Sequence, residues 1–113
     1  MARIAEPMEE GMMKWTLIRY ETKPELADRN AELIGAVFAE LKVTAPEGVR
    51  YLSLRLDDNT FVHLVETASD AGNVIPGLAA FKAFQNGIRE RCVEPPLFGD
   101  VTIVGDYRML GAT

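Results

Sequence analysis

The segment from Tyr51 to Glu66, YLSLRLDDNTFVHLVE, constrains the fold of this chain most, because it reads as a β-hairpin. Apolar residues recur at alternate positions on both sides of a polar triplet, Asp57–Asp58–Asn59, as in two strands that bury one face. A three-residue loop would put Asn59 in the left-handed conformation, which asparagine tolerates, and would pair Ser53 with His63. A two-residue loop would mix the two faces, so we expect the three-residue loop.

This register gives the hairpin two chemically different faces. The aliphatic face is the expected seat of the helices, and it consists of Leu52, Leu54, Leu56, Val62 and Leu64. The mixed face consists of Tyr51, Ser53, Arg55, Phe61, His63 and Val65. The mixed face is too apolar for open water and too polar for a dry core, which favours a second copy of the chain packed against it across a two-fold axis. We therefore expect a homodimer through the sheet face opposite the helices.

The rest of the chain adds two strands and two helices to this hairpin. In chain order we expect a strand over 14–21, a helix from a Thr22–Glu25 capping box to about Lys42, strands over 49–56 and 60–66, a helix over 78–92 that Gly87 weakens, and a strand over 101–109. The order β-α-β-β-α-β is that of the ferredoxin-like unit, in which two helices cover one face of a four-stranded antiparallel sheet. The predicted fold class is α+β, with a single domain at 13–113 after a flexible tail at 1–12.

Composition excludes several kinds of partner. The chain has 113 residues, which suits one domain, and a formal net charge of −5 with scattered basic residues, which argues against nucleic acid and anionic membranes. No apolar run approaches the ~20 residues that cross a bilayer, and the first residues do not form a signal peptide. The single cysteine, Cys92, cannot form a disulfide within the chain, so we expect a cytoplasmic protein in which Cys92 is a structural thiol.

The sequence resembles the antibiotic-biosynthesis-monooxygenase-like proteins of the dimeric α+β barrel group over about residues 13–110. The resemblance lies in the element order, in the Asp57–Phe61 turn into an apolar strand that ends at Glu66, and in the Phe81-Lys-Ala-Phe84 helix. It implies that the sheets of two protomers close into a barrel. It also implies a cofactor-independent monooxygenase acting on a small aromatic or quinol-type molecule. The haem-degrading branch uses an Asn on strand one, a Trp on strand three and a His on helix two, and the lack of all three here disfavours that branch.

His63 and Arg55 are the candidate catalytic residues. An imidazole can serve as a general base or hydrogen-bond donor near neutral pH, and a guanidinium can hold an anionic oxygen of a ligand. Each has a structural alternative. His63 could be satisfied by Ser53, by Arg55 or by the partner chain, and Arg55 could pair with a carboxylate such as Glu21.

Aromatic rings are the candidate walls of a ligand site. Those that could stack on an aromatic substrate are Trp15, Tyr20, Tyr51, Phe61 and Tyr107, and we expect Trp15, Tyr51 and Phe61, with Ser53, to contact it. We expect no metal and no cofactor, because one histidine with one cysteine argues against zinc and no nucleotide-binding motif is present. Two functions stay open: a cofactor-free oxygenase, and a non-catalytic protein that binds a small ligand or uses the mixed face for assembly.

Overall fold

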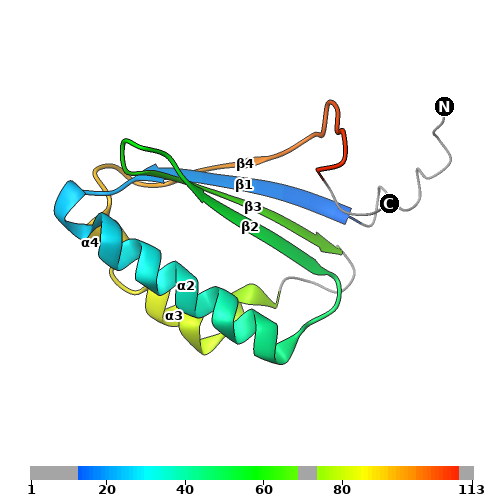
Figure 1. Cartoon of the computed structure of the whole chain (residues 1–113), viewed down its shortest axis with the longest axis horizontal. Helices are drawn as coiled ribbons and strands as arrows, with labels where there is room; N and C mark the ends of the chain where they lie inside the picture. The colour runs from blue at the N-terminus through cyan, green and yellow to red at the C-terminus, as the bar shows by residue number, and fades with distance from the viewer. Residues whose placement is uncertain (1–12, 69–73, 110–113) are drawn as a thin grey trace, which may run out of the picture.

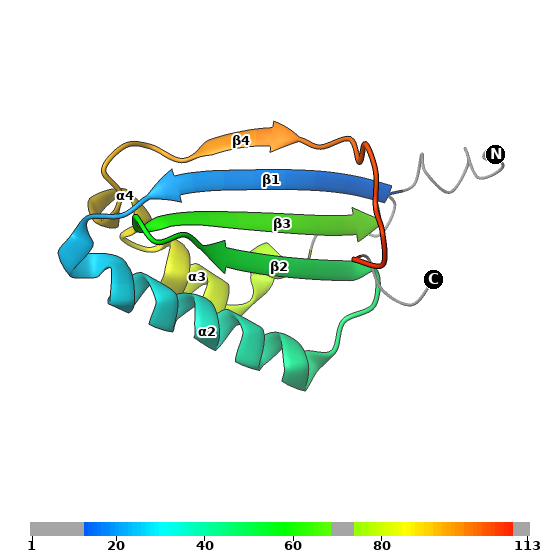
Figure 2. The same cartoon turned by 45° about the horizontal axis from the view of Figure 1, so that its top comes forward.

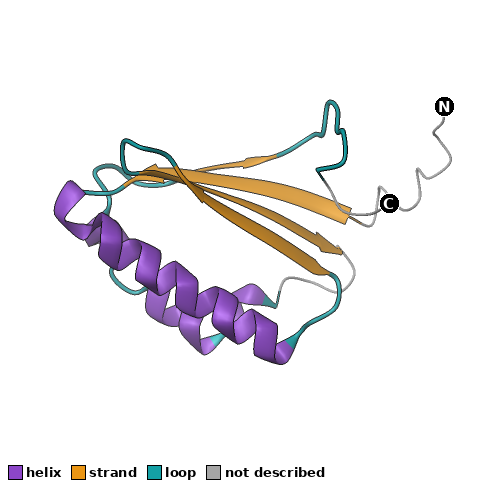
Figure 3. Ribbon diagram, viewed as in Figure 1, coloured by secondary structure: helices purple, strands orange, loops and turns teal. Residues whose placement is uncertain are grey.

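A computed structural model of the chain describes residues 13–68 and 74–109, so the tail expected at 1–12 lies outside the described residues. The elements are β1 (Met13–Glu21), a 3-10 turn at Pro24–Leu26, α2 (Ala27–Thr44), β2 (Val49–Arg55), β3 (Thr60–Ala68), a 3-10 turn at Ile75–Gly77, α3 (Ala79–Gln85), α4 (Ile88–Arg91) and β4 (Leu97–Asp100). The strands form one antiparallel sheet in the order β2-β3-β1-β4 (Figure 2). The helices lie on one side of this sheet (Figures 1 and 3), so the predicted α+β, ferredoxin-like fold is confirmed. Within the described residues, no helix is long and apolar enough to cross a membrane.

The predicted hairpin register is confirmed. Ser53 lies opposite His63, and the other expected pairs, Leu52 with Leu64 and Leu54 with Val62, are also present. Asn59 has a φ of 69°, as the three-residue loop requires. The loop is closed by the Leu56 amide, which donates to the Thr60 carbonyl at 2.8 Å.

The predicted placement of the helices on the aliphatic face is wrong. Phe61 and His63 of the mixed face are only 2% and 3% exposed, whereas Leu52 and Leu54 of the aliphatic face are 47% and 51% exposed. The helices therefore cover the mixed face. The aliphatic face forms the outer side of the sheet.

Aromatic packing explains why the helices take the mixed face. Phe38 of α2 stacks on Tyr51 with ring centroids 4.7 Å apart, and Phe84 of α3 lies 5.8 Å from the His63 ring. Large rings fill the space between the layers, and polar groups among them can be buried when they bond to one another. The period of two in a strand shows which residues share a face, but it does not show which face the helices cover.

The start of α2 differs from the expected capping box. Thr22 does not cap the helix; its hydroxyl lies 3.4 Å from the Asn59 carbonyl oxygen, and its amide donates to the same oxygen at 3.0 Å. Lys23 is the residue before the 3-10 turn, and its side chain makes no capping bond. Thr22 is fully buried and ties the entry of α2 to the hairpin loop.

The second predicted helix is interrupted. Gly87 has a φ of 85°, a left-handed conformation that glycine adopts without strain, and it divides 78–92 into α3 and α4. The short α4 then turns Arg91 and Cys92 back toward the core, where both are buried.

The fourth strand is β4 at 97–100, so the prediction of a strand over 101–109 is wrong. β4 pairs with β1 from Arg19 opposite Leu97 to Thr16 opposite Asp100, and the Val101 amide still donates to the Trp15 carbonyl at 2.9 Å. Trp15 is only two residues from the start of β1 at Met13. The chain beyond 101 therefore has almost no part of β1 left to pair with. Figure 2 shows this orange-red segment turning across the end of the sheet toward β2.

Candidate functional site

Four polar side chains meet between the sheet and the helices. The Tyr20 hydroxyl of β1 lies 2.8 Å from Nε2 of His63, on the neighbouring strand β3. On the other side of the ring, the hydroxyls of Tyr51 and Ser53, both on β2, each lie 2.7 Å from Nδ1. Three adjacent strands of one face therefore hold the imidazole through both of its nitrogens.

Asn30 and Arg91 extend this network away from the hairpin. The Asn30 amide nitrogen lies 3.0 Å from the Tyr20 hydroxyl, and its oxygen accepts from Nε of Arg91 at 2.9 Å. Arg91 also donates to the carbonyls of Phe84 and Asn86 at the end of α3. Carbonyls at a helix C-terminus carry partial negative charge, which stabilises this buried guanidinium.

Burial sets the protonation of the network. It lowers the pKa of His63 from 6.5 to about 4, so the imidazole is neutral at neutral pH. Burial also raises the pKa of Tyr20 well above 10.0, although the hydrogen bond from Asn30 acts in the opposite direction. The pKa of Tyr51 is raised by burial as well, against a lowering by its hydrogen bond with Ser53. The resting network is therefore a chain of neutral groups that ends at one cation, Arg91.

A small apolar pocket of about 110 Å³ opens beside these groups. Its polar lining is formed by Tyr20, Tyr51, His63 and Gln85, and its apolar lining by Ile18, Phe81, Phe84, Ile88, Pro96 and Phe98. Phe98 lies on β4 at the edge of the sheet and is 73% exposed, so this side of the pocket faces the surface. No carboxylate, lysine or arginine of the described chain lines the pocket.

The structure brings together some of the predicted site residues. His63, Tyr51 and Ser53 belong to one network, and Tyr51 and His63 also line the pocket. Phe61 stacks on Tyr20 with centroids 5.6 Å apart and lies in the core rather than at the pocket wall. Trp15 lies on the outer face of the sheet, where it pairs with Glu66, and does not reach this pocket.

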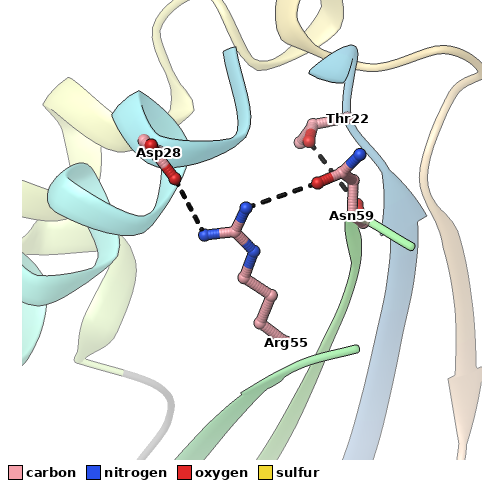
Figure 4. A network of polar contacts seen from close by, with 4 residues as sticks. All are labelled: Thr22, Asp28, Arg55 and Asn59. Carbon is pink, nitrogen blue, oxygen red and sulfur yellow. Dashed lines mark hydrogen bonds and ion pairs between the residues drawn. The ribbon is translucent and has the colours of Figure 1, made fainter. Parts of the chain in front are cut away.

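Arg55 does not line the pocket. Its guanidinium bonds to Asp28 at 3.1 Å and to the Asn59 side chain at 3.3 Å (Figure 4), and it lies over the Phe61 ring, 5.5 Å from the centroid. The carboxylate partner is therefore Asp28 of α2 and not Glu21, the example considered from the sequence. Arg55 connects the hairpin loop to the helix.

Sequence reasoning missed two members of the network. Arg91 belongs to a charged run, Arg89-Glu-Arg91, of a kind that is usually solvated, but it is only 7% exposed. Asn30 is fully buried. The sequence could have identified Asn30 as a buried polar residue, because it falls in a stripe with helical spacing formed by Leu26, Asn30, Ile34 and Val37. A polar residue within such an apolar stripe needs a buried partner.

Comparisons with known proteins identify the fold. No protein-family model and no curated protein matches the sequence. Among solved structures, a candidate antibiotic biosynthesis monooxygenase from Bacteroides thetaiotaomicron is similar with a TM-score of 0.72 and 16% identity, over 91% of this chain and 98% of that one. One from Caulobacter crescentus has a TM-score of 0.67 and 21% identity, over 82% of this chain and 91% of that one.

A third structure is that of a mutant of SnoaB, described as a cofactor-independent oxygenase from Streptomyces nogalater. It has a TM-score of 0.62 and 15% identity, over 84% of this chain and 96% of that one. These identities are low, so the similarity concerns the fold, and it extends over nearly the whole length of each of these proteins. The chain has the fold of the antibiotic-biosynthesis-monooxygenase-like proteins.

Proposed function

We propose that this protein is a cofactor-independent oxygenase that acts on a small aromatic or quinol-type molecule bound between the sheet and α3. The observation that carries the proposal is the pocket itself, which has aromatic walls and, at its base, the hydrogen-bonded groups of Tyr20, His63 and Tyr51. The similarity to SnoaB, a described cofactor-independent oxygenase, supports the reaction class.

The pocket limits the size and charge of the ligand. Its volume of about 110 Å³ is below the roughly 150 Å³ of an engineered cavity that binds benzene, so the pocket must widen to hold even a single aromatic ring. The exposed ring of Phe98 at its edge is the part of the lining that we expect to move. With a neutral His63 and no other ionisable lining except tyrosine among the described residues, the pocket favours an uncharged ligand.

The chemistry must draw its electrons from the substrate. A phenol and O₂ can give a quinone and water: one oxygen atom enters the ring, the other leaves as water, and the phenol supplies four electrons. With a pKa of about 4, His63 is a weak base, so its part is to relay hydrogen bonds rather than to hold a proton. The apolar walls admit O₂, and Tyr51 is the polar group of the lining best suited to orient the phenol oxygen.

Turnover and binding test this proposal together. Oxygen uptake is measured with monocyclic phenols and hydroquinones, and binding of the same compounds is followed by thermal shift. Tyr51→Phe should lose about 10²-fold or more in turnover, as expected when a transition-state hydrogen bond is removed. Tyr107→Phe is the matched control, because Tyr107 is 78% exposed and absent from the lining of this pocket. Equal turnover in both variants would remove Tyr51 from the mechanism.

A non-catalytic ligand-binding protein is the second candidate. It is favoured by the internal pairing of the polar groups: both nitrogens of His63 have partners, and Arg55 is paired with Asp28. Saturable binding of phenols without oxygen uptake would select this function. Failure to bind any of them would exclude both candidates.

We also infer that the protein forms a homodimer through the outer, aliphatic face of the sheet. The half-exposed side chains Leu52 and Leu54 share this face with Leu17, Val62 and Leu64, and a contiguous apolar face of this kind marks an interface. The part of the chain after β4 adds further apolar side chains, with Ile103, Val104, Tyr107 and Met109 between 41% and 99% exposed. A second copy is the natural occupant, because the family resemblance implies that two such sheets pack face to face.

A further inference from the structure

A guanidinium at one end of the polar network fixes the direction of its hydrogen bonds. Arginine has only N–H donors, so Nε of Arg91 must donate to the Asn30 atom that faces it at 2.9 Å. That atom is therefore the amide oxygen, and the other end of the amide is the NH₂ group. This NH₂ group faces the Tyr20 hydroxyl at 3.0 Å, so Asn30 must donate there.

The direction of the Asn30–Tyr20 hydrogen bond determines the direction of the bond between the Tyr20 hydroxyl and His63. The hydroxyl oxygen accepts from Asn30, and its proton needs an acceptor, because Tyr20 is only 5% exposed. Among the described residues the hydroxyl has two hydrogen-bond partners, Asn30 and Nε2 of His63, the second at 2.8 Å. If Nε2 carried a proton, the Tyr20 proton would be buried without an acceptor. Nε2 must therefore accept.

A neutral imidazole with an unprotonated Nε2 carries its proton on Nδ1. Nδ1 then donates to the oxygen of Tyr51 or Ser53, each 2.7 Å away. One hydroxyl proton of this pair has no acceptor within the network as the structure describes it. When Ser53 donates to Tyr51 in the hydrogen bond between them, the remaining proton is that of the Tyr51 hydroxyl. Tyr51, unlike Ser53, lines the pocket, so a ligand oxygen can accept this proton.

We propose that Arg91 and Asn30 are positioning residues that hold His63 as its Nδ1–H tautomer, and that the Tyr51–Ser53 pair consequently presents a hydroxyl proton to a ligand oxygen in the pocket. The ligand part rests on the proposed function. The tautomer belongs to the resting protein and is tested without turnover, so each part can fail separately.

The tautomer is read directly from the ¹⁵N and ¹H signals of the imidazole at neutral pH. His63 is the single histidine of the chain, so the ring gives one set of signals that needs no assignment. We expect the proton on Nδ1 and a nonprotonated Nε2. A ring with its proton on Nε2 would overturn the proposal, whatever any variant shows.

Asn30→Asp tests the role of the positioning residues. A carboxylate can accept from both Arg91 and Tyr20, so the Tyr20 oxygen becomes free to accept from His63, and the ring proton should move to Nε2. The new charge faces a buried guanidinium, which favours retention of the fold. The matched control is Asn59→Asp, because the Asn59 side chain also accepts from an arginine, Arg55, but has no contact with the network. The control should keep the proton on Nδ1; a folded Asn30→Asp protein that also keeps it there would show that Asn30 does not set the tautomer.

A pair of ligands of equal shape tests the hydroxyl proton. Benzaldehyde and styrene differ in that an accepting oxygen replaces a CH₂ group, and both are uncharged molecules with one ring. Titration followed by the His63 ring signals should give roughly tenfold tighter binding for benzaldehyde, or more, as one hydrogen bond to a buried donor allows. Equal affinities would overturn the ligand part of the proposal and leave the tautomer standing.

Discussion

At the scale of single residues, three hydroxyl groups define the chemistry of His63. Tyr20, Tyr51 and Ser53 satisfy both ring nitrogens without supplying a charge, so the ring can be buried while it stays neutral. Burial makes the imidazole a poor base. A histidine in this setting relays the direction of the hydrogen bonds from one neighbour to the next. This role differs from that of the general base considered from the sequence.

The buried, neutral state of His63 predicts an acid-dependent loss of stability. Its pKa falls from 6.5 to about 4 on folding, so between these two values the unfolded chain binds a proton that the folded chain does not. The free energy of unfolding should therefore decrease as the pH falls from 6.5 to 4, by about 3 kcal/mol from this group alone. Above pH 6.5 this contribution is fully present.

His63→Gln isolates this contribution, because glutamine can form hydrogen bonds but does not titrate. Urea unfolding of both proteins is measured from mildly acidic to neutral pH. The carboxylates titrate in both, so the difference between the two curves reports His63. The wild-type curve should fall more steeply toward acid, and parallel curves would contradict the lowered pKa.

Part of the site could be predicted at this scale. His63 and Tyr51 could be identified from the sequence because they alternate with leucines in a hairpin whose register the Asn59 loop fixes. The burial of Arg91 could not be predicted, because it depends on where the chain turns after α3. A charge run reads the same whether its helix continues into solvent or folds back.

At the scale of elements, the break at Gly87 is what builds the distal end of the network. It ends α3 at a point where the Phe84 and Asn86 carbonyls face Arg91 on α4. A continuous helix over 78–92 would use the Phe84 carbonyl for its own backbone bond. The sequence shows Gly87 as a weak point of the helix. It does not show that the following turn folds back, because this depends on the tertiary packing of Arg91 and Cys92.

Gly87→Ala should destabilise the protein because of this conformation. Its φ of 85° strains any residue with a Cβ, and the expected loss is about 1 to 2 kcal/mol in the free energy of unfolding. The added Cβ would lie 3.6 Å from the nearest Arg91 nitrogen, an ordinary contact, so the loss comes from the backbone.

Gly35→Ala is the matched control for this prediction. Gly35 lies within α2, and a Cβ added there would meet nothing within 4 Å. The change should stabilise the helix by roughly 0.5 to 1 kcal/mol, since alanine has the higher helix propensity. Chemical denaturation of the two variants should therefore give shifts of opposite sign, and equal shifts would show that the Gly87 conformation carries no strain.

The order of the elements could be predicted better than the sheet face that the helices cover. The order of strands and helices and the hairpin register followed from period and turn chemistry, and both are confirmed. The fourth strand was misplaced because the apolar and β-branched pattern over 101–109 is also compatible with a segment that does not pair in the sheet. Its pairing depends on how much of β1 remains, which is a property of the sheet and not of the segment.

At the scale of the whole molecule, the two faces of the sheet differ in what covers them. The aromatic and polar face lies under the helices, and the pocket lies between this face and the α3–α4 segment. No helix covers the other face (Figure 1), which carries the half-exposed side chains Leu52 and Leu54. The homodimer stays a proposal, and the reason for it changes: the uncovered face is apolar, not mixed.

Leu54→Lys should dissociate the proposed dimer. Leu54 lies on the outer face of the edge strand β2 and is 51% exposed. The two-fold axis would place two lysines in the interface, and each replaces a leucine whose full burial is worth about 1.5 to 3 kcal/mol. The dissociation constant should rise by roughly 10²-fold or more. Sedimentation equilibrium measures it, with Val43→Lys as the control, because Val43 is 85% exposed on α2, on the opposite side of the sheet.

Trp15 gives an independent reading of the same equilibrium. It is the single tryptophan of the chain, and it lies on the outer face together with Leu17 and Leu64. Its fluorescence should shift to longer wavelength when the wild-type protein is diluted below its dissociation constant, because water then reaches the ring. Leu54→Lys should show the shifted spectrum already at high concentration, whereas Val43→Lys should follow the wild type. A wild-type protein that sediments as a monomer at all concentrations, with a constant Trp15 spectrum, would exclude the barrel and leave each pocket to a single chain.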